Sequence, residues 1–297
     1  MTVKWGHAAS IILVSRQSRR VLLLRRGDTA AFMPGAAVFP GGVCAPGESS
    51  QQTALRELFE ETGILALSGG RFRLAATDAD TRKLQDEVNA AGREGVDVFY
   101  KATPTSSLAS SSLLPWSTWL TPNAAHYRRR YYTAFHLMAV DEELAVRHCD
   151  REMSGHMWAE PAAILEEARE GKKKKANSVV LPPPQVYELS RLAKMRNLDT
   201  LPSEVSSRVL FPQTLIAKRP GAPDLLCNVL PGDQLYVEEP EGQYEQGTRE
   251  IALEALLKPD QTKPIHRITY SSDPLYTNFN LDIRGLEDFP TSRDSKM

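Results

Sequence analysis

The sequence contains few cysteines, and their spacing excludes several kinds of site. Cys44, Cys149 and Cys227 lie far apart in a chain of 297 residues, and no two of them form a C-x-x-C pair. An odd number of widely separated cysteines excludes a zinc ribbon, a C-x-x-C redox motif and a disulfide framework. We therefore expect the protein to work in a reducing compartment.

An excess of charge and a long apolar run are also absent. Lys and Arg number 36 against 37 Asp and Glu, which gives a net charge of −1. Without a positive excess, the whole molecule is not attracted to nucleic acid or to an anionic membrane, so we expect neither as a partner. The apolar residues 8–14 are too few to span a bilayer and lack a small-residue cleavage site, so we expect no membrane anchor and no signal peptide.

What the sequence does contain is a globular composition, with 41% hydrophobic and 25% charged residues. Apolar runs that begin at His7 and Val21 predict two strands joined by a turn. A third short strand, residues 37–39, leads into a Pro-Gly-Gly turn. The pattern then becomes helical over residues 50–62, and Gly63 is the predicted stop.

The rest of the chain combines helix and strand patterns. Residues 69–118 contain a polar helical pattern and a serine-rich stretch, TPTSSLASSSLLP, which we expect to be an insertion outside the core and partly mobile. Apolar runs from Tyr131 and Gly155 predict two more strands. Helices are predicted from Pro161 and from the LPPPQ segment at Leu181.

The helix predicted over residues 50–62 has two distinct faces. At about 100° per residue, Glu57, Glu60 and Glu61 project from one face, with Arg56 beside them, and an apolar stripe occupies the other. Carboxylates three or four residues apart repel one another, so a positive partner is expected. A divalent cation such as Mg²⁺ or Mn²⁺ prefers such oxygen ligands, and Arg56 can pair with Glu60. An ordinary acidic helix face is the alternative interpretation.

The frame around this helix favours the cation site, because a Gly-Gly turn, a glutamate, the acidic face and a Gly stop follow at fixed spacing. The segment from Gly42 to Ile64 resembles the Nudix box, G-x5-E-x7-R-E-U-x-E-E-x-G-U, where U is apolar. The resemblance implies an α/β protein, a Nudix α/β/α sandwich around a mixed sheet, that hydrolyses a nucleoside diphosphate linked to another moiety. The nine specified positions are occupied by Gly42, Glu48, Arg56, Glu57, Leu58, Glu60, Glu61, Gly63 and Ile64.

The resemblance also implies the roles of individual residues. Glu57, Glu60 and Glu61 would bind the metal or its water, and the backbone of Gly42 would lie close to it. Arg56 would orient the glutamates, which completes a catalytic set of four residues. Either Glu60 or Glu61 would accept the proton from the attacking water.

The resemblance extends to one substrate class. The turn that ends in Gly41 and Gly42, preceded by a leucine-rich strand with Arg25, resembles the G-x3-F-P-G-G signature of coenzyme A diphosphatases. Ala31 departs from that signature, which has an arginine there. The segments FMPGAAVFPGG, WSTWLTP, LPPPQVYELSRLA and LPGDQLY resemble the peroxisomal branch called nucleoside diphosphate-linked moiety X motif 19. This branch cleaves coenzyme A or acyl-CoA to 3′,5′-ADP and 4′-phosphopantetheine or its acylated form.

Arginines near a predicted strand are candidates for the substrate's 3′-phosphate. Arg128, Arg129 and Arg130 precede the strand at Tyr131, and guanidinium groups pair with phosphate in a bidentate manner. A solvated strand end is the alternative interpretation. The predicted substrate-binding residues are therefore Arg25, Gly41, Arg129 and Arg130.

The last three residues add an expectation about location. Ser295, Lys296 and Met297 differ by one residue from the S-K-L peroxisomal signal, which works only at a free C-terminus. With the resemblance to a peroxisomal branch, this tripeptide predicts a peroxisomal protein that binds the import receptor. The predicted organisation is a Nudix domain over residues 1–200, a β-rich extension over 201–290 and a tail over 291–297.

Two other functions stay open at this stage. The same chemistry could act on ADP-ribose, NADH or capped RNA, since the box specifies the reaction rather than the substrate. A Nudix-like module that binds a nucleotide without cleaving it is the other possibility, although the chain keeps every glutamate of the box.

Overall fold

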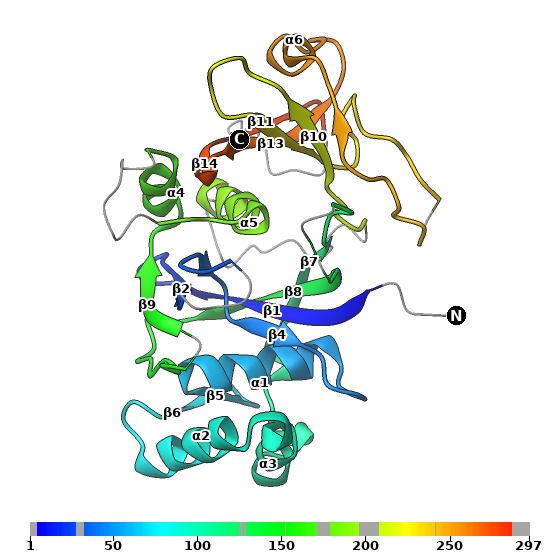
Figure 1. Cartoon of the computed structure of the whole chain (residues 1–297). Helices are drawn as coiled ribbons and strands as arrows, with labels where there is room; N and C mark the ends of the chain where they lie inside the picture. The colour runs from blue at the N-terminus through cyan, green and yellow to red at the C-terminus, as the bar shows by residue number, and fades with distance from the viewer. Residues whose placement is uncertain are drawn as a thin grey trace, which may run out of the picture.

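A seven-stranded mixed sheet forms the centre of the protein (Figure 1). The computed structural model describes residues 5–27, 33–124, 127, 129–151, 153–170, 179–195, 208–240 and 242–286. In the sheet, β1 (Gly6–Ser15) and β8 (Tyr131–Val140) are parallel, and the other strand pairs are antiparallel. The order is β3-β2-β1-β8-β7, with β4 paired to β1 and β9 paired to β2. The remaining strands are β2 (Val21–Arg26), β3 (Ala37–Val38), β4 (Gly41–Val43), β7 (Leu114–Leu120) and β9 (Met153–Ala159).

Helices cover both faces of this sheet, which confirms the α/β/α sandwich. Along β1, Ile11 packs into the cluster that contains α1 (Ser50–Thr62), whereas Ile12 packs into the cluster of α4 (Pro161–Glu170) and α5 (Pro183–Lys194). A strand buried on both faces is apolar throughout rather than alternating, which explains the continuous apolar run that predicted it. The sheet therefore supports α1 on one side and the C-terminal half of the chain on the other.

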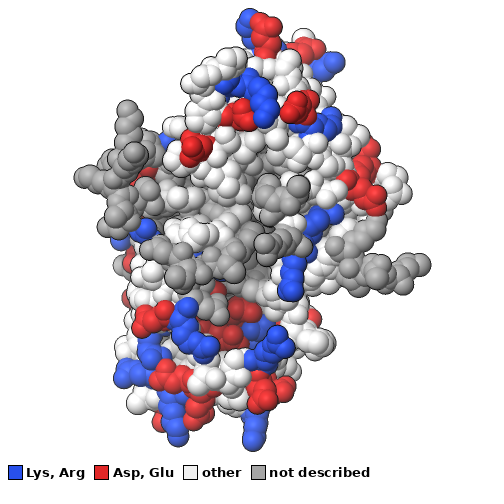
Figure 2. Space-filling view, in the orientation of Figure 1, with Lys and Arg blue, Asp and Glu red and all other residues white. Residues whose placement is uncertain are grey.

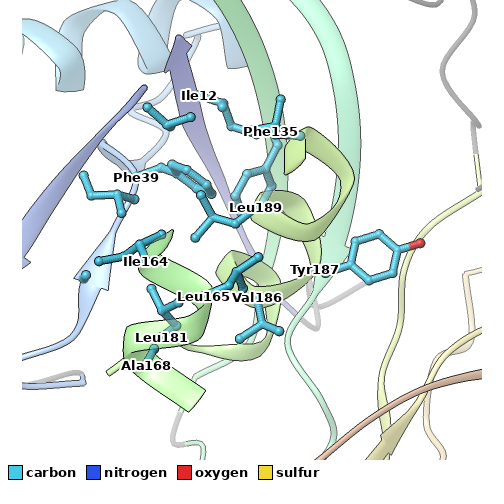
Figure 3. Close-up of a cluster of buried hydrophobic side chains, with 14 of the residues drawn as sticks. Ile12, Phe39, Phe135, Ile164, Leu165, Ala168, Leu181, Val186, Tyr187 and Leu189 are labelled. Atoms are coloured by element: carbon cyan, nitrogen blue, oxygen red, sulfur yellow. The ribbon is translucent and has the colours of Figure 1, made fainter. Parts of the chain in front are cut away.

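The core on the α4 and α5 side is built from large apolar side chains. Figure 3 shows Leu189 of α5 close to Phe39 and Phe135, whereas Leu165 of α4 and Val186 of α5 lie farther from the sheet, among the helices. The described part of the chain contains no helix that is both long and apolar enough to cross a bilayer.

Further elements lie on the outer side of α1 (Figure 1). They include α2 (Ala79–Ala91), α3 (Gly95–Ala102) and the hairpin of β5 (Ile64–Leu67) and β6 (Arg71–Leu74). Short 3₁₀ turns occur at Gly92–Glu94, Thr105–Ser107 and Ser110–Ser112.

The serine-rich stretch corrects one expectation. We predicted a loop outside the core, but Leu108, Ala109 and Leu113 are buried in the same cluster as α1. Leu108, Ala109 and Leu113 flank the two 3₁₀ turns, whose serines stay largely accessible. The high serine content therefore did not indicate that these three apolar side chains are buried. The chain then continues directly into β7 of the central sheet, before the end of the predicted insertion at residue 118.

A second, five-stranded sheet lies beyond α4 and α5, where the sequence predicted a β-rich extension. Its order is β12-β10-β11-β13-β14. Ile268, Tyr270 and Phe279 of this sheet join the core cluster of α4 and α5, so the two sheets share a core across these helices. The predicted boundary at residue 200 falls outside the described residues and stays a prediction. The elements are β10 (Gln213–Ala217), β11 (Leu225–Val229), β12 (Arg249–Glu250), α6 (Leu253–Leu257), β13 (Ile265–Ser272) and β14 (Leu275–Arg284).

One buried carboxylate ties α5 to the central sheet. Glu188 of α5 is fully buried. Its carboxylate accepts hydrogen bonds from the indole N–H groups of Trp116 (2.7 Å) and Trp119 (2.8 Å) and from the hydroxyl of Ser117 (2.6 Å), all on β7. Arg191 supplies a positive partner at 3.0 Å. A buried charge with this many donors is held in one position.

We predict that Glu188→Ala lowers the free energy of unfolding by about 3 kcal/mol, because it leaves the partly buried Arg191 guanidinium and two buried indole N–H groups without their acceptor. Urea denaturation followed by tryptophan fluorescence measures the change. Glu166→Ala, at an exposed position on α4, is the control and should unfold like the unmodified chain. Equal stability of the two variants would contradict the role of Glu188.

Candidate active site

The helix α1 begins and ends where its sequence predicts. Ser49 is the N-cap: its hydroxyl accepts from the Gln52 N–H (3.2 Å), and the Gln52 side chain accepts from the Ser49 N–H (2.8 Å). At the other end, Gly63 adopts a left-handed conformation with φ of 70°. The capping box and the glycine stop satisfy backbone groups at both ends, so the acidic residues stand on a well-defined helix.

The two faces of α1 also match the prediction. The apolar stripe of Ala54, Leu55, Leu58, Phe59 and Thr62 is buried. On the other face, the side chains of Glu57 and Glu60 remain 15% and 22% exposed. Glu61 is buried, although it belongs to the same acidic group. Figure 2 shows acidic and basic side chains interspersed over the lower part of the molecule, where Figure 1 places α1, α2 and α3.

Arg56 lies at the centre of these carboxylates. Its Nη1 donates to Glu57 Oε1 (2.8 Å) and to Glu60 Oε1 (3.0 Å), which confirms the predicted pair with Glu60. Its Nε and Nη2 donate to the two oxygens of Glu48, at 2.7 and 3.0 Å. Nη2 also donates to the carbonyl of Val43 (3.2 Å). The buried guanidinium therefore balances much of the repulsion between the glutamates and orients two of them.

Glu48 receives further hydrogen bonds that fix its position. Its oxygens accept from the Ala45 N–H (2.7 Å), the Thr53 hydroxyl (2.9 Å) and the Tyr100 hydroxyl (2.6 Å). Burial by itself raises the pKa of Glu48, but the hydrogen bonds from Arg56, Tyr100 and Ala45 outweigh it and lower the pKa to about 2. The Glu48 carboxylate is therefore ionised at neutral pH.

The sequence did not identify Tyr100 as part of this site. The residue lies on α3, within the segment predicted to be an insertion, about fifty positions from Glu48. No motif connects the two residues, and only the packing of α3 against the box loop brings them together.

The Gly-Gly turn contacts two of the glutamates. The backbone N–H of Gly41 donates to Glu61 Oε2 (2.9 Å). A Cβ atom on Gly42 would lie 2.4 Å from the carboxylate carbon of Glu57, so only glycine allows this close approach. The structure thus brings Gly41 and Gly42 together with Glu57 and Glu61.

The oxygen donors of this site fit a hard divalent cation, which prefers carboxylate ligands. Within the described ranges, no three His, Cys, Asp or Glu side chains are already grouped so that they could hold a metal ion. Glu57 and Glu60 turn toward Arg56, whereas Glu61 turns toward Gly41. The site therefore supplies donors of the right chemistry on one helix face, and their roles in binding metal stay predictions.

One of the predicted substrate-binding arginines, Arg130, contacts other parts of the chain. Arg130 donates to the carbonyls of Thr121 (3.0 Å) and Tyr244 (2.9 Å), and its guanidinium lies over the rings of Trp5 and Phe211. The Arg130 side chain therefore joins the segment before β1 to the C-terminal region, and its substrate-binding role stays a prediction.

Other predicted residues keep their status as predictions. Arg129 is exposed just before β8, and Arg25 is half-buried on β2. Ala31, Arg128 and the tripeptide Ser295, Lys296 and Met297 lie outside the described residues.

Comparisons with known proteins identify the family. The NUDT19 Nudix domain matches residues 46–192. The Caenorhabditis elegans protein "Putative nudix hydrolase 7" is 38% identical over 95% of this chain and 90% of its own length. Human "Acyl-coenzyme A diphosphatase NUDT19" is 26% identical over 92% of this chain and 91% of its own length. The corresponding Gallus gallus protein is 28% identical over 80% and 81%.

A solved structure supports the fold. The crystal structure of a Nudix hydrolase from Alicyclobacillus acidocaldarius superposes with a TM-score of 0.55 at 21% identity, and the match covers 69% of this chain and 99% of the other. Nudix enzymes generally use divalent metal ions, which agrees with the donor chemistry of the acidic face. Together, the complete box, its geometry and these relatives show that the chain belongs to the Nudix hydrolase family, as a pyrophosphatase that acts on a small-molecule substrate.

Proposed function

We propose that this Nudix hydrolase cleaves the diphosphate of coenzyme A or acyl-CoA, with 3′,5′-ADP and 4′-phosphopantetheine or its acylated form as products. The observation that carries the proposal is the similarity, over most of the chain, to relatives named acyl-coenzyme A diphosphatase. The local geometry agrees with it, because Gly41, the first glycine of the Gly-Gly pair that ends the coenzyme A diphosphatase signature, donates directly to Glu61 of the box.

The proposed cofactor is Mg²⁺ or Mn²⁺, held by Glu57, Glu60 and Glu61. When bound, such an ion neutralises the charge of a diphosphate and acidifies water. The rest of the mechanism depends on the chain's own residues. Arg56 orients Glu57 and Glu60 through its Nη1, and Gly41 fixes Glu61. Glu60 or Glu61 is the proposed general base, since both carboxylates project from the same helix turn.

Arg129 is the proposed partner of the 3′-phosphate that distinguishes coenzyme A from its dephosphorylated form. Its side chain is exposed next to β8, and a guanidinium binds phosphate through two parallel hydrogen bonds. Arg25 and Gly41 remain proposed substrate contacts on the strength of the signature.

We predict that the purified protein, with Mg²⁺, converts coenzyme A and acetyl-CoA to products that include 3′,5′-ADP, and that EDTA abolishes the reaction. Glu61→Gln should lower turnover by about 100-fold or more without unfolding the chain, because the amide keeps the shape but lacks the negative charge with which Glu61 would bind the cation. Glu87→Gln, at an exposed position on α2, is the matched control. Chromatographic separation of the products measures both effects.

The same assay, extended to ADP-ribose, NADH and capped RNA, separates the alternatives. Cleavage of one of these substrates without cleavage of coenzyme A would refute the proposed substrate and keep the family chemistry. Binding of nucleotides without any cleavage would instead indicate a non-catalytic module.

We predict that Glu48 makes the protein sensitive to acid. Its pKa is about 2 in the folded protein against an ordinary 4.5, so its contribution is fully present above about pH 4.5 and is lost as the pH falls toward 2. This difference corresponds to about 3 kcal/mol of stability. Glu48→Gln should be less stable than the unmodified chain at neutral pH and lose less stability across this window, as measured by urea unfolding at several pH values. Parallel pH profiles for the two proteins would contradict this role.

We propose, from the sequence, that the tripeptide Ser295-Lys296-Met297 directs the protein to peroxisomes through the import receptor. A fluorescent protein fused to the N-terminus of the chain should co-localise with a peroxisomal marker. Removal of the three residues should leave the fusion in the cytosol. An unchanged distribution after removal would refute the targeting role.

A further inference from the structure

The carboxyl end of α1 is held by residues that lie outside the Nudix box. The last four carbonyls of a helix have no partner within the helix. In α1, the Phe59 carbonyl accepts from the Gly63 N–H (2.8 Å). The Glu61 and Thr62 carbonyls accept from the backbone N–H groups of Cys149 (3.1 Å) and Arg147 (2.9 Å). The connection between β8 and β9 therefore closes this end of the helix.

The Glu60 carbonyl has different partners, the side-chain amides of α2. It accepts from Gln85 Nε2 (3.1 Å) and from Asn89 Nδ2 (3.1 Å). The same Gln85 nitrogen also lies within hydrogen-bond distance of the carbonyls of Phe59 (3.3 Å) and Arg147 (3.0 Å). One fully buried amide thus joins α1, α2 and the β8–β9 connection.

The orientation of this amide is determined by its charged neighbour. Arg147 Nη1 lies 2.8 Å from Gln85 Oε1. A guanidinium can only donate, so the oxygen of Gln85 must face it and the NH₂ group must face the carbonyls. Arg147 is held in turn by Asp86 of α2, at 2.8 Å. These contacts allow only one orientation of the Gln85 side-chain amide.

We infer that Gln85 is a positioning residue for Glu60 and Glu61, and that Asn89 assists it. This role rests on the proposed function, in which these glutamates bind the cation. Helix α2 then belongs to the catalytic framework, although α2 lies outside the box. The last turn of α1 carries both glutamates, and Glu61 must stay within reach of the Gly41 N–H. Without the amide donors, that turn loses the contacts that hold it against α2.

The test compares Gln85→Glu with Gln17→Glu, which adds the same charge on the exposed turn between β1 and β2. A glutamate at position 85 keeps the acceptor for Arg147 but places a carboxylate oxygen against three carbonyls. We expect Mn²⁺, measured by its electron paramagnetic resonance signal, to bind about 10-fold more weakly. We also expect kcat for coenzyme A to fall by about 10-fold with KM close to that of the unmodified chain.

A milder variant keeps the test decisive if Gln85→Glu does not fold. Asn89→Ala removes a single donor to the Glu60 carbonyl and should change Mn²⁺ affinity and kcat in the same direction, by a smaller factor. Its control is Glu87→Ala, on the exposed face of α2. Circular dichroism of each variant verifies its folding.

The outcomes separate this inference from the proposed function. Folded variants that bind Mn²⁺ and turn over substrate like their controls would show that Gln85 and Asn89 only pack α2, and would overturn the inference. If the unmodified chain cleaves no coenzyme A, the proposed substrate fails, but the comparison of Mn²⁺ affinities still tests the positioning role. An unmodified chain that binds no Mn²⁺ would overturn both.

Discussion

A single guanidinium organises the acidic site of this protein. Removing the charge of Arg56 from water costs several kcal/mol unless it is paired and hydrogen-bonded, and here its nitrogens contact Glu48, Glu57, Glu60 and a backbone carbonyl. Because these partners come from both the box loop and the helix, the same contacts that satisfy the charge also dock the loop onto α1. The hydrogen bonds that pair the buried Arg56 charge therefore also orient Glu57 and Glu60, two candidate metal ligands.

The two ends of α1 are held in different ways, and the difference follows from where the functional groups lie. The amino end uses local contacts, a capping box within the helix itself. The carboxyl end, which carries Glu60 and Glu61, depends on α2 and on the connection between β8 and β9. The position of these two glutamates therefore depends on contacts with elements that are distant in the sequence.

The C-terminal sheet completes the core on the opposite face of the central sheet. The side chains of β13 and β14 join the cluster of α4 and α5, and Glu188 joins α5 to β7. Arg130 belongs to this framework as well, since its guanidinium lies over the rings of Trp5, before β1, and of Phe211, before β10. The sequence places Arg130 just before a strand, but such a position does not reveal which groups the side chain will contact.

The sequence alone determined the boundaries of α1, its two faces and the pair of Arg56 and Glu60, because these depend on helical spacing and on residues within one short segment. It also predicted the mixed sheet through the family resemblance. Only the tertiary structure decided that Tyr100 contacts Glu48, that Gln85 contacts the Glu60 carbonyl and that the serine-rich stretch contributes to the core. These contacts join residues 25 to 52 positions apart or depend on which few side chains turn inward, and no local pattern encodes such distances.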